Sequence, residues 1–327
     1  MAEPQPPLNI WAVSDGRAGI EAQALGLAEG VARLTPATIT IKRVRWRAGL
    51  GRLPWRLIPT TGLRATSQID PPWPDIWIAA GRATLPLSTR MRAWSGGRTF
   101  VVQTQDPRTS LAPFDLVVPP EHDGLSGDNV LPIVGAPNRL TPEKLAADLA
   151  MFAPQIDALP HPRVAVVIGG KSSAFDLPTD YAAQLANDVV AAVDAAGGSL
   201  MVSFTRRTPA PARAAMAAVF ARAPGVIWDE VSNNPYFAYL AAADAILVTG
   251  ESTNLATDAA ATGAPVYVLS LPGRSAKLGR FHADLARRGV TRPFAGRLEA
   301  WTYPPLRETD RAAEALLRRY AAGKNST

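Results

Sequence analysis

Apolar residues along the chain form short runs that alternate with stretches of helical periodicity. In the first half, the runs predict strands at residues 10–13, 38–44, 75–80, 99–103 and 115–118. After the first strand, Ile20, Ala24, Leu27 and Val31 recur at the spacing of one helix face. Strands that end in small or polar residues and are separated by helices are typical of a parallel sheet.

The same alternation starts again after residue 160. It predicts strands at 163–168, 199–204, 226–228, 245–248 and 266–269, and helices at 179–196, 211–221, 235–242, 253–262 and 310–320. The prolines of Leu159-Pro160-His161-Pro162 cannot continue a helix, so we expect the domain boundary there. The chain is therefore predicted to form two Rossmann-like α/β domains, 1–158 and 159–305, with parallel sheets facing across a cleft. A C-terminal helix in 306–327 is expected to pack back on the first domain.

Composition removes several classes of function. The 327 residues include no cysteine, which excludes disulfide scaffolds, iron–sulfur clusters and thiol catalysis. The three histidines are far apart and form no metal-ligand pair, so no metal site is predicted. No window holds eighteen consecutive apolar residues, and the start MAEPQPP lacks the pattern of a secretion signal. We therefore expect a cytoplasmic protein without a membrane-spanning helix.

Positive charge is concentrated in one segment, although the whole chain has a net charge of +6. Between residues 42 and 69 there is no acidic residue, and the seven basic ones are Lys42, Arg43, Arg45, Arg47, Arg52, Arg56 and Arg64. Tryptophans and leucines alternate with them. This basic-aromatic segment, residues 42–64, favours an anionic membrane surface over nucleic acid as a partner. An ordinary solvated loop is the alternative.

The most informative segment for chemistry is the predicted strand–loop–helix over residues 245–262. Its loop places Thr249, Gly250, Glu251, Ser252, Thr253 and Asn254 at a helix N-terminus. Free N–H groups and the helix dipole favour a phosphate there. Two turns into the helix, Asp258 could accept hydrogen bonds from ribose hydroxyls. The alternative is an ordinary capped helix with a surface Asp.

Two further loops follow predicted strands of the second half. One contains Gly169, Gly170, Lys171 and Ser172, whose amides and ammonium suit a diphosphate, although the P-loop spacing is absent. The other contains Ser203, Arg206 and Arg207, which could clamp phosphate. A simple turn and a solvated loop are the respective alternatives.

In the first half, Asp15 follows the first strand in the loop Ser14-Asp15-Gly16-Arg17-Ala18-Gly19. It is a candidate general base, or it stabilises its own turn.

Several of these pieces together resemble one family. The strings SDGRAG, GGKS, FTRRTP, NNPYFAYLAAADAILVTGEST and TGAPVYVL are similar to the bacterial relatives of the plant elongated-mitochondria fission factor. More distantly, the chain resembles two-domain glycosyltransferases of the MurG kind, with a GT-B fold. That resemblance implies that residues 169–172 and 249–254 hold the diphosphate, that Asp258 binds ribose, and that Asp15 lies near the base or acceptor. The first loop departs from the MurG pattern, which leaves the base assignment open.

Members of this family are often labelled as nucleoside-diphosphate-sugar epimerases, but the sequence lacks the motifs that this activity needs. Nicotinamide-dependent epimerases need a GxGxxG loop and a YxxxK pair, and the only such pair is Tyr320 with Lys324 near the C-terminus.

The resulting hypothesis is a metal-independent glycosyltransferase. It would move a sugar from a nucleoside-diphosphate donor to an acceptor hydroxyl, and one acceptor that fits the basic-aromatic segment is a membrane glycolipid. The donor is a substrate, and no cofactor is predicted. The chain would then lie peripherally on the inner face of a membrane. The alternative is a non-catalytic adaptor that keeps a transferase-like fold.

Overall fold

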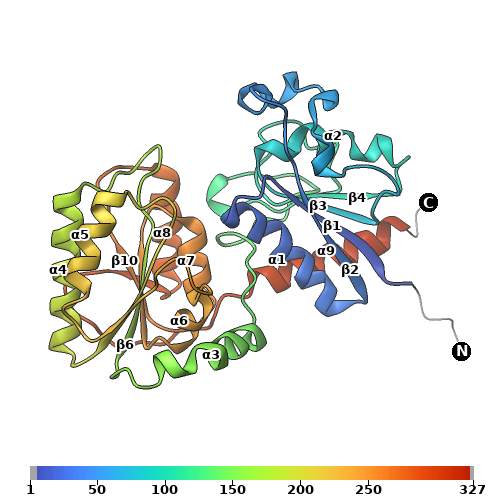
Figure 1. Cartoon of the computed structure of the whole chain (residues 1–327). Helices are drawn as coiled ribbons and strands as arrows, with labels where there is room; N and C mark the ends of the chain where they lie inside the picture. The colour runs from blue at the N-terminus through green and yellow to red at the C-terminus, as the bar shows by residue number, and fades with distance from the viewer. Residues whose placement is uncertain (1–5, 325–327) are drawn as a thin grey trace, which may run out of the picture. The chain divides into compact units, whose positions relative to one another are not determined.

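A computed structural model of the chain describes residues 6–324 and divides it into two compact units (Figure 1). The first unit consists of residues 1–139 and 307–327, and the second of residues 140–306. The expectation about a secretion signal rests partly on residues 1–5, which lie outside the described residues. None of the helices described is long and apolar enough to span a lipid bilayer.

The sheet of the first unit has five parallel strands. They are β1 (Leu8–Ser14), β2 (Ala37–Arg43), β3 (Ile76–Ala79), β4 (Phe100–Gln103) and β5 (Leu116–Val117), in the order β2-β1-β3-β4-β5. The direction of the order reverses between β1 and β3. In sheets of this kind, ligands bind beyond the carboxyl ends of the strands at such a reversal.

Helices cover both faces of this sheet because successive residues of a strand point to opposite sides. Ile10 and Ala12 of β1 lie in a core with α1 (Ala18–Leu34) and α9 (Glu308–Lys324). Trp11 and Val13 lie in the opposite core with α2 (Leu85–Trp94). The C-terminal helix α9 packs on α1 at close range, since a Cβ on Gly30 would lie 3.0 Å from the Cβ of Ala313.

The segment between β2 and β3 is a series of short 3-10 turns. They are η1 (Leu50–Arg52), η2 (Trp55–Leu57), η3 (Thr60–Gly62) and η4 (Ala65–Ser67). Two more follow, η5 (Arg82–Thr84) before α2 and η6 (Glu121–Asp123) after β5.

The sheet of the second unit has six parallel strands in the order β11-β10-β9-β6-β7-β8. The strands are β6 (Arg163–Ile168), β7 (Ser199–Phe204), β8 (Gly225–Ile227), β9 (Ala245–Thr249), β10 (Val266–Leu269) and β11 (Thr291–Pro293). This is the Rossmann order, with its reversal between β6 and β9. The loops after β6 and β9 therefore flank the position where such sheets bind nucleotides.

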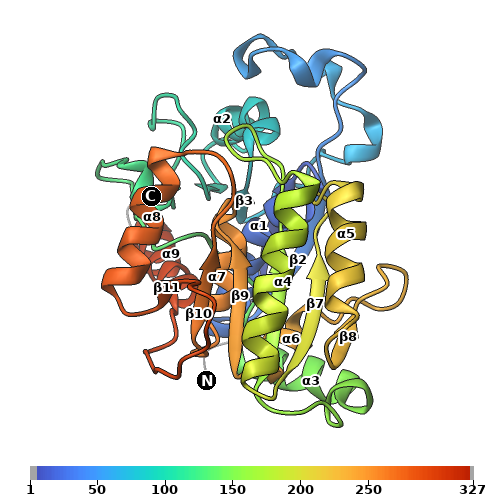
Figure 2. The ribbon, with the colours of Figure 1, turned by 90° about the vertical axis from the view of Figure 1, so that its left-hand side faces the viewer.

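Six helices surround this sheet. They are α3 (Pro142–Ile156), α4 (Thr179–Ala195), α5 (Ala210–Phe220), α6 (Tyr236–Ala242), α7 (Thr253–Ala260) and α8 (Ala276–Arg287). α4 and α5 lie side by side in one apolar core (Figure 2). α3 packs on α6, where the Lys144 ammonium lies 4.6 Å from the centre of the Phe237 ring.

The boundary between the units differs from the one expected at residues 158–162. It lies between Arg139 and Leu140, because α3 packs on α6 of the second unit. The chain crosses a second time at residues 306–307, and α9 completes the first unit. The predicted class of two parallel α/β sheets is confirmed, whereas the sequence reading missed α2, α3, α8 and β11.

Candidate functional site

Three loops meet at the carboxyl edge of the second sheet. The Gly169 N–H after β6 donates to Thr249 Oγ1 at the end of β9, with a distance of 2.7 Å. The next N–H, of Gly170, donates to Glu251 Oε1 at 3.0 Å. The Lys171 N–H donates to the backbone oxygen of Arg207, after β7, at 3.0 Å. The glycine loop and the β9 loop that the sequence singled out therefore touch each other directly.

Glu251 lies at the centre of this junction. Its side chain has no exposed surface, and Arg207 Nη2 donates to Oε1 at 2.8 Å. The second oxygen, Oε2, is buried and has no hydrogen-bond partner within the described part of the chain. Burial raises the pKa of Glu251 above its usual value, and the Arg207 charge opposes this. The carboxylate thus joins the loops after β6, β7 and β9.

Close packing explains the two glycines. A Cβ on Gly169 would lie 1.8 Å from Glu251 Oε1. Gly170 has a φ of 144°, and a Cβ there would lie 2.6 Å from the backbone oxygen of Arg207. Both positions therefore need glycine for the fold of the loops themselves, independently of any ligand.

The groups predicted to hold a diphosphate are thus partly engaged within the protein. The amides of Gly169, Gly170 and Lys171 already donate to protein oxygens. The Ser172 hydroxyl accepts from the amides at 174 and 175, and Ser203 is buried inside β7. The Lys171 ammonium is exposed, 3.9 Å from Asp176 Oδ1. Of the paired arginines, Arg207 is held by Glu251, and Arg206 is exposed.

The start of α7 lies beside this junction. Ser252 caps the helix by accepting from the Leu255 N–H at 3.4 Å, and Thr253 and Asn254 are the first two helical residues. Gly250 donates through its N–H to the Leu269 oxygen at 2.9 Å. As predicted, these residues form a loop and a capped helix start after a buried strand.

His282 of α8 reaches the same loop. Its Nε2–H donates to the Gly250 oxygen at 2.6 Å, and burial lowers the pKa of the imidazole. The other ring nitrogen, Nδ1, is buried and has no hydrogen-bond partner among residues 6–324. A neutral ring that donates through Nε2 leaves Nδ1 as an acceptor.

Asp258 of α7 is half-buried, and the hydroxyl of Tyr236 donates to its Oδ2 at 2.9 Å. Burial raises the pKa of Asp258 to about 7, although the Tyr236 hydrogen bond lowers it. Burial and the nearby Asp258 raise the pKa of Tyr236 well above its usual value. Tyr236 begins α6, so this pair joins α6 to α7 near the β6–β9 reversal.

In the first unit, the candidate base Asp15 is engaged by Arg17. Its Oδ1 accepts from the Arg17 N–H at 3.0 Å, and its Oδ2 accepts from Arg17 Nε at 2.8 Å. Arg45 Nη1 donates to the backbone oxygen of Asp15 at 3.1 Å. These contacts stabilise the turn after β1, which was the alternative to a general base for Asp15.

The basic-aromatic segment is partly neutralised by the first unit itself. Arg43 forms two hydrogen bonds with Glu21, at 2.7 and 2.9 Å, and these lower the pKa of Glu21. Lys42 donates to the Gln68 oxygen, and Arg56 to Thr109. Two apolar side chains of the segment remain exposed, Leu53 at 39% and Leu57 at 66%.

Sequence reasoning missed Thr208, Tyr236 and His282. The Thr208 hydroxyl lies 2.9 and 2.6 Å from the backbone oxygens of Ile168 and Gly169, which fixes the β7 loop on the β6 loop. Thr208 and Tyr236 belong to the strings FTRRTP and NNPY, which support the family resemblance, but the sequence analysis assigned no role to either residue. For His282 no local pattern gave a signal.

Comparison with known proteins identifies relatives across most of the chain. The family model described as "Mitochondrial fission ELM1" matches residues 18–320. The mitochondrial fission protein ELM1 of Arabidopsis thaliana is 33% identical over 276 residues, which are 76% of this chain and 64% of the plant protein. The match therefore spans less than two thirds of the length of that relative.

Solved structures with similar folds have low sequence identity to the chain. A candidate UDP-N-acetylglucosamine 2-epimerase from Listeria monocytogenes gives a TM-score of 0.61 at 12% identity, covering 98% of both chains. The glycotransferase of kitacinnamycin gives 0.50 at 15% identity, covering 97% of this chain and 94% of that one. These likenesses confirm the GT-B-like pair of Rossmann-like domains, which hosts more than one chemistry.

Proposed function

The chain belongs to the mitochondrial fission ELM1 family, and from this premise we propose that its second unit binds a nucleoside-diphosphate sugar and supports transfer of the sugar to an acceptor hydroxyl. The observation that favours this most is the position of Asp258. It stands on the helix that follows β9, at the reversal of a Rossmann-ordered sheet, and Tyr236 holds one of its oxygens at 2.9 Å. A half-buried carboxylate at that point suits two vicinal ribose hydroxyls.

In this proposal, the diphosphate is bound at the start of α7 and not inside the glycine loop. The N–H group at 253 and the helix dipole would face it. The exposed Arg206 and Lys171 would neutralise the leaving diphosphate, so no metal and no cofactor are proposed. The junction around Glu251 then serves as the rigid support of the site.

The acceptor side of the proposal concerns the first unit. Asp15 would remove the proton of the acceptor hydroxyl once the hydroxyl displaces Arg17. The basic-aromatic segment, with exposed Leu53 and Leu57, would bring the protein peripherally to an anionic membrane that holds a glycolipid acceptor.

A non-catalytic adaptor is the second candidate, and one observation favours it. The loop amides that would cradle a diphosphate donate to Thr249, Glu251 and Arg207, with a buried carboxylate beside them. A protein that no longer turns over a nucleotide sugar could close its loops in this way. The name of the Arabidopsis relative refers to mitochondrial fission, and a partner-binding role in a comparable process would be part of this candidate.

Calorimetric titration with UDP, GDP, ADP and CMP tests the binding proposal. We expect micromolar binding of one of them, weakened at least about tenfold in Asp258→Asn and in Arg206→Ala. Asp194→Asn is the matched control, because Asp194 is an exposed carboxylate on α4 of the same unit. No binding at millimolar nucleotide would favour the adaptor.

Product analysis then separates the enzymatic options. The full chain is incubated with the UDP-sugar or GDP-sugar whose nucleotide binds, together with a lipid extract. Labelled sugar in the lipid fraction supports transfer. Conversion of the sugar nucleotide to its epimer with no labelled lipid would instead place the chain with the epimerases that share its fold.

A further inference from the structure

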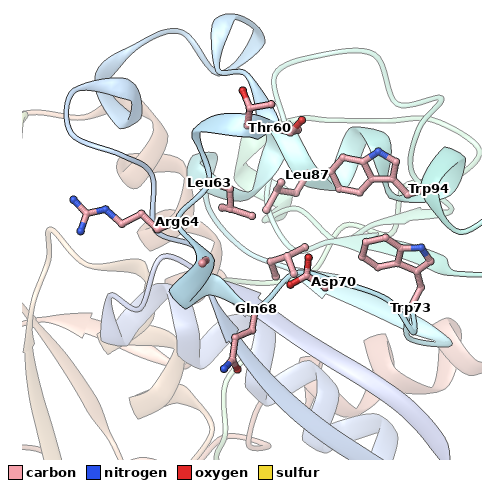
Figure 3. A pocket seen from close by; sticks show the side chains of 11 residues that line it. Thr60, Leu63, Arg64, Gln68, Asp70, Trp73, Leu87 and Trp94 are labelled. Carbon is pink, nitrogen blue, oxygen red and sulfur yellow. The ribbon is translucent and has the colours of Figure 1, made fainter.

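A cavity lies in the first unit, between residues 60–73 and α2. Its volume is about 340 Å³, at the lower end of the range of small-molecule sites (Figure 3). Trp73 precedes β3 and Trp94 ends α2, so both stand toward the amino ends of the strands. The candidate residue Asp15 and its neighbours Ser14 and Arg17 do not line this cavity.

The apolar part of the lining is an aromatic platform. The rings of Trp73 and Trp94 stack with centroids 5.8 Å apart and an angle of 17° between their planes. Trp11 supports Trp73 edge-on from the core, at 6.2 Å. Leu63 and Leu87 face the platform in Figure 3. Both platform rings are only half-buried, so they still present apolar surface to the cavity.

The polar part of the lining consists of uncommitted hydrogen-bonding groups. Asp70 lies beside Trp73 in Figure 3 and Thr60 lies on the rim, whereas the side chain of Gln68 points away from the cavity. Within residues 6–324, none of these three side chains makes a hydrogen bond or ion pair with the protein. Arg64 also borders the cavity, but its guanidinium points away from it (Figure 3).

We propose that this cavity binds a saccharide, with the apolar face of one pyranose ring on the Trp73–Trp94 platform. The ring hydroxyls would donate to the Asp70 carboxylate and exchange hydrogen bonds with the Thr60 hydroxyl. An anionic ligand is disfavoured because Asp70 is the charged group beside the platform. A lipid chain is disfavoured because it would cover the Asp70 carboxylate and the Thr60 hydroxyl without offering them hydrogen bonds. A hydroxylated ring can pack on the tryptophans with its apolar face and form hydrogen bonds with the polar side chains through its hydroxyl groups.

The experiment uses full-length protein with 5-fluorotryptophan, whose ¹⁹F resonances at positions 73 and 94 are assigned with Trp73→Phe and Trp94→Phe. The probes are N-acetylglucosamine and methyl β-glucopyranoside, titrated to about 100 mM since single sugars bind with millimolar constants. We expect the two resonances to shift with one of the sugars. In Asp70→Asn the apparent dissociation constant should rise about fivefold or more.

Two controls keep the result specific. Asp128→Asn removes another exposed carboxylate of the first unit and should bind like the wild type. Asp258→Asn should also leave the sugar-induced shifts unchanged, so failure of the nucleotide site and failure of this site are distinguishable. The proposal is overturned if no sugar moves the two resonances, if Asp70→Asn binds as tightly as the wild type, or if choline shifts them and sugars do not.

Discussion

At the scale of single residues, the Glu251 carboxylate makes the contacts that proteins commonly make with a bound anion. It accepts from a loop amide and from Arg207, which are the groups that commonly hold a phosphate oxygen. Removing one partner of a buried charge pair is costly because the other charge stays buried and uncompensated. Glu251 has no exposed side-chain surface, whereas 42% of the Arg207 side chain is exposed. The cost should therefore be larger when the arginine is lost.

We expect Arg207→Ala to lower the free energy of unfolding by about 2–4 kcal/mol, because it leaves the Glu251 carboxylate unpaired. The neighbouring Arg206→Ala should change it by less than about 0.5 kcal/mol, since Arg206 is an exposed side chain. Urea denaturation of the two variants at neutral pH measures the difference. Equal stabilities would show that Glu251 does not depend on Arg207.

Asp258 should make stability depend on pH. Its pKa is about 7 in the folded chain and about 3.9 in an unfolded one, so the folded state holds a proton that the unfolded state loses first. The stabilisation is fully present below pH 4 and is lost as pH rises through 7. Relative to Asp258→Asn, the wild type should lose about 2–4 kcal/mol between those pH values.

Unfolding titrations of both proteins at pH 4 and pH 7.5 measure this change. The matched control, Asp194→Asn, keeps Asp258, so its stability should change with pH as that of the wild type does. Parallel pH profiles for the wild type and Asp258→Asn would contradict the assignment of the raised pKa.

The sequence predicted part of the site at this scale. The loops at 169–172 and 249–254 were found because a glycine-rich or small polar loop after an apolar strand is a local pattern. Contacts of Tyr236 and His282 could not be found in this way. Tyr236 meets Asp258, and His282 meets Gly250, only through the packing of α6 and α8, and no local spacing encodes such contacts.

At the scale of elements, the loop after β6 is specified by backbone geometry. Gly170 combines a φ of 144° with a neighbouring carbonyl at 2.6 Å from its would-be Cβ, so a side chain meets both strain and a clash. We expect Gly170→Ala to destabilise the protein by about 2–4 kcal/mol. Thermal unfolding and the loop amide resonances are the measurements.

Gly279→Ala is a control with the opposite sign. Gly279 lies inside α8, and a Cβ there meets nothing within 4 Å. Alanine should stabilise that helix by about 0.5–1 kcal/mol. A stabilising Gly170→Ala would mean that the loop adopts a different conformation in solution.

The elements missed from the sequence have weak or short signals. α3 begins with the capping residue Thr141 followed by Pro142, which is a typical helix start, but Pro154 interrupts its pattern. β11 has three residues, includes Pro293 and pairs only with β10. An edge strand of this kind lacks the apolar run that revealed the central strands.

At the scale of the whole molecule, the fold class could be predicted from the sequence, but the order of the strands could not. Alternating strands and helices predict parallel sheets, whereas strand order depends on pairings between distant segments such as β6 with β9. The boundary was misplaced for a similar reason. Which unit α3 and α9 join depends on the faces they bury, and those faces have no partner nearby in sequence.

The return of α9 has a testable consequence. Ala312, Ala313 and Leu316 of α9 are fully buried in the core that contains α1, and Glu308 Oε2 accepts from the Val134 N–H at 2.9 Å. A chain that ends at residue 306 therefore exposes one side of α1. Since burial of a single leucine contributes roughly 2–3 kcal/mol, loss of the whole helix exceeds what a marginally stable domain tolerates.

We therefore expect residues 1–306 to contain a folded second unit and an unfolded first unit, because residues 140–306 are continuous and include all six strands of their sheet. Hydrogen exchange should show protected amides in β6, β7 and β9 and rapid exchange in β1 and β3. In the full chain, Leu316→Ala should weaken protection selectively in the first unit. Equal protection of both sheets in the truncated chain would mean that the first unit folds without α9. Residues 307–327 would then not belong to the cooperative unit formed by residues 1–139.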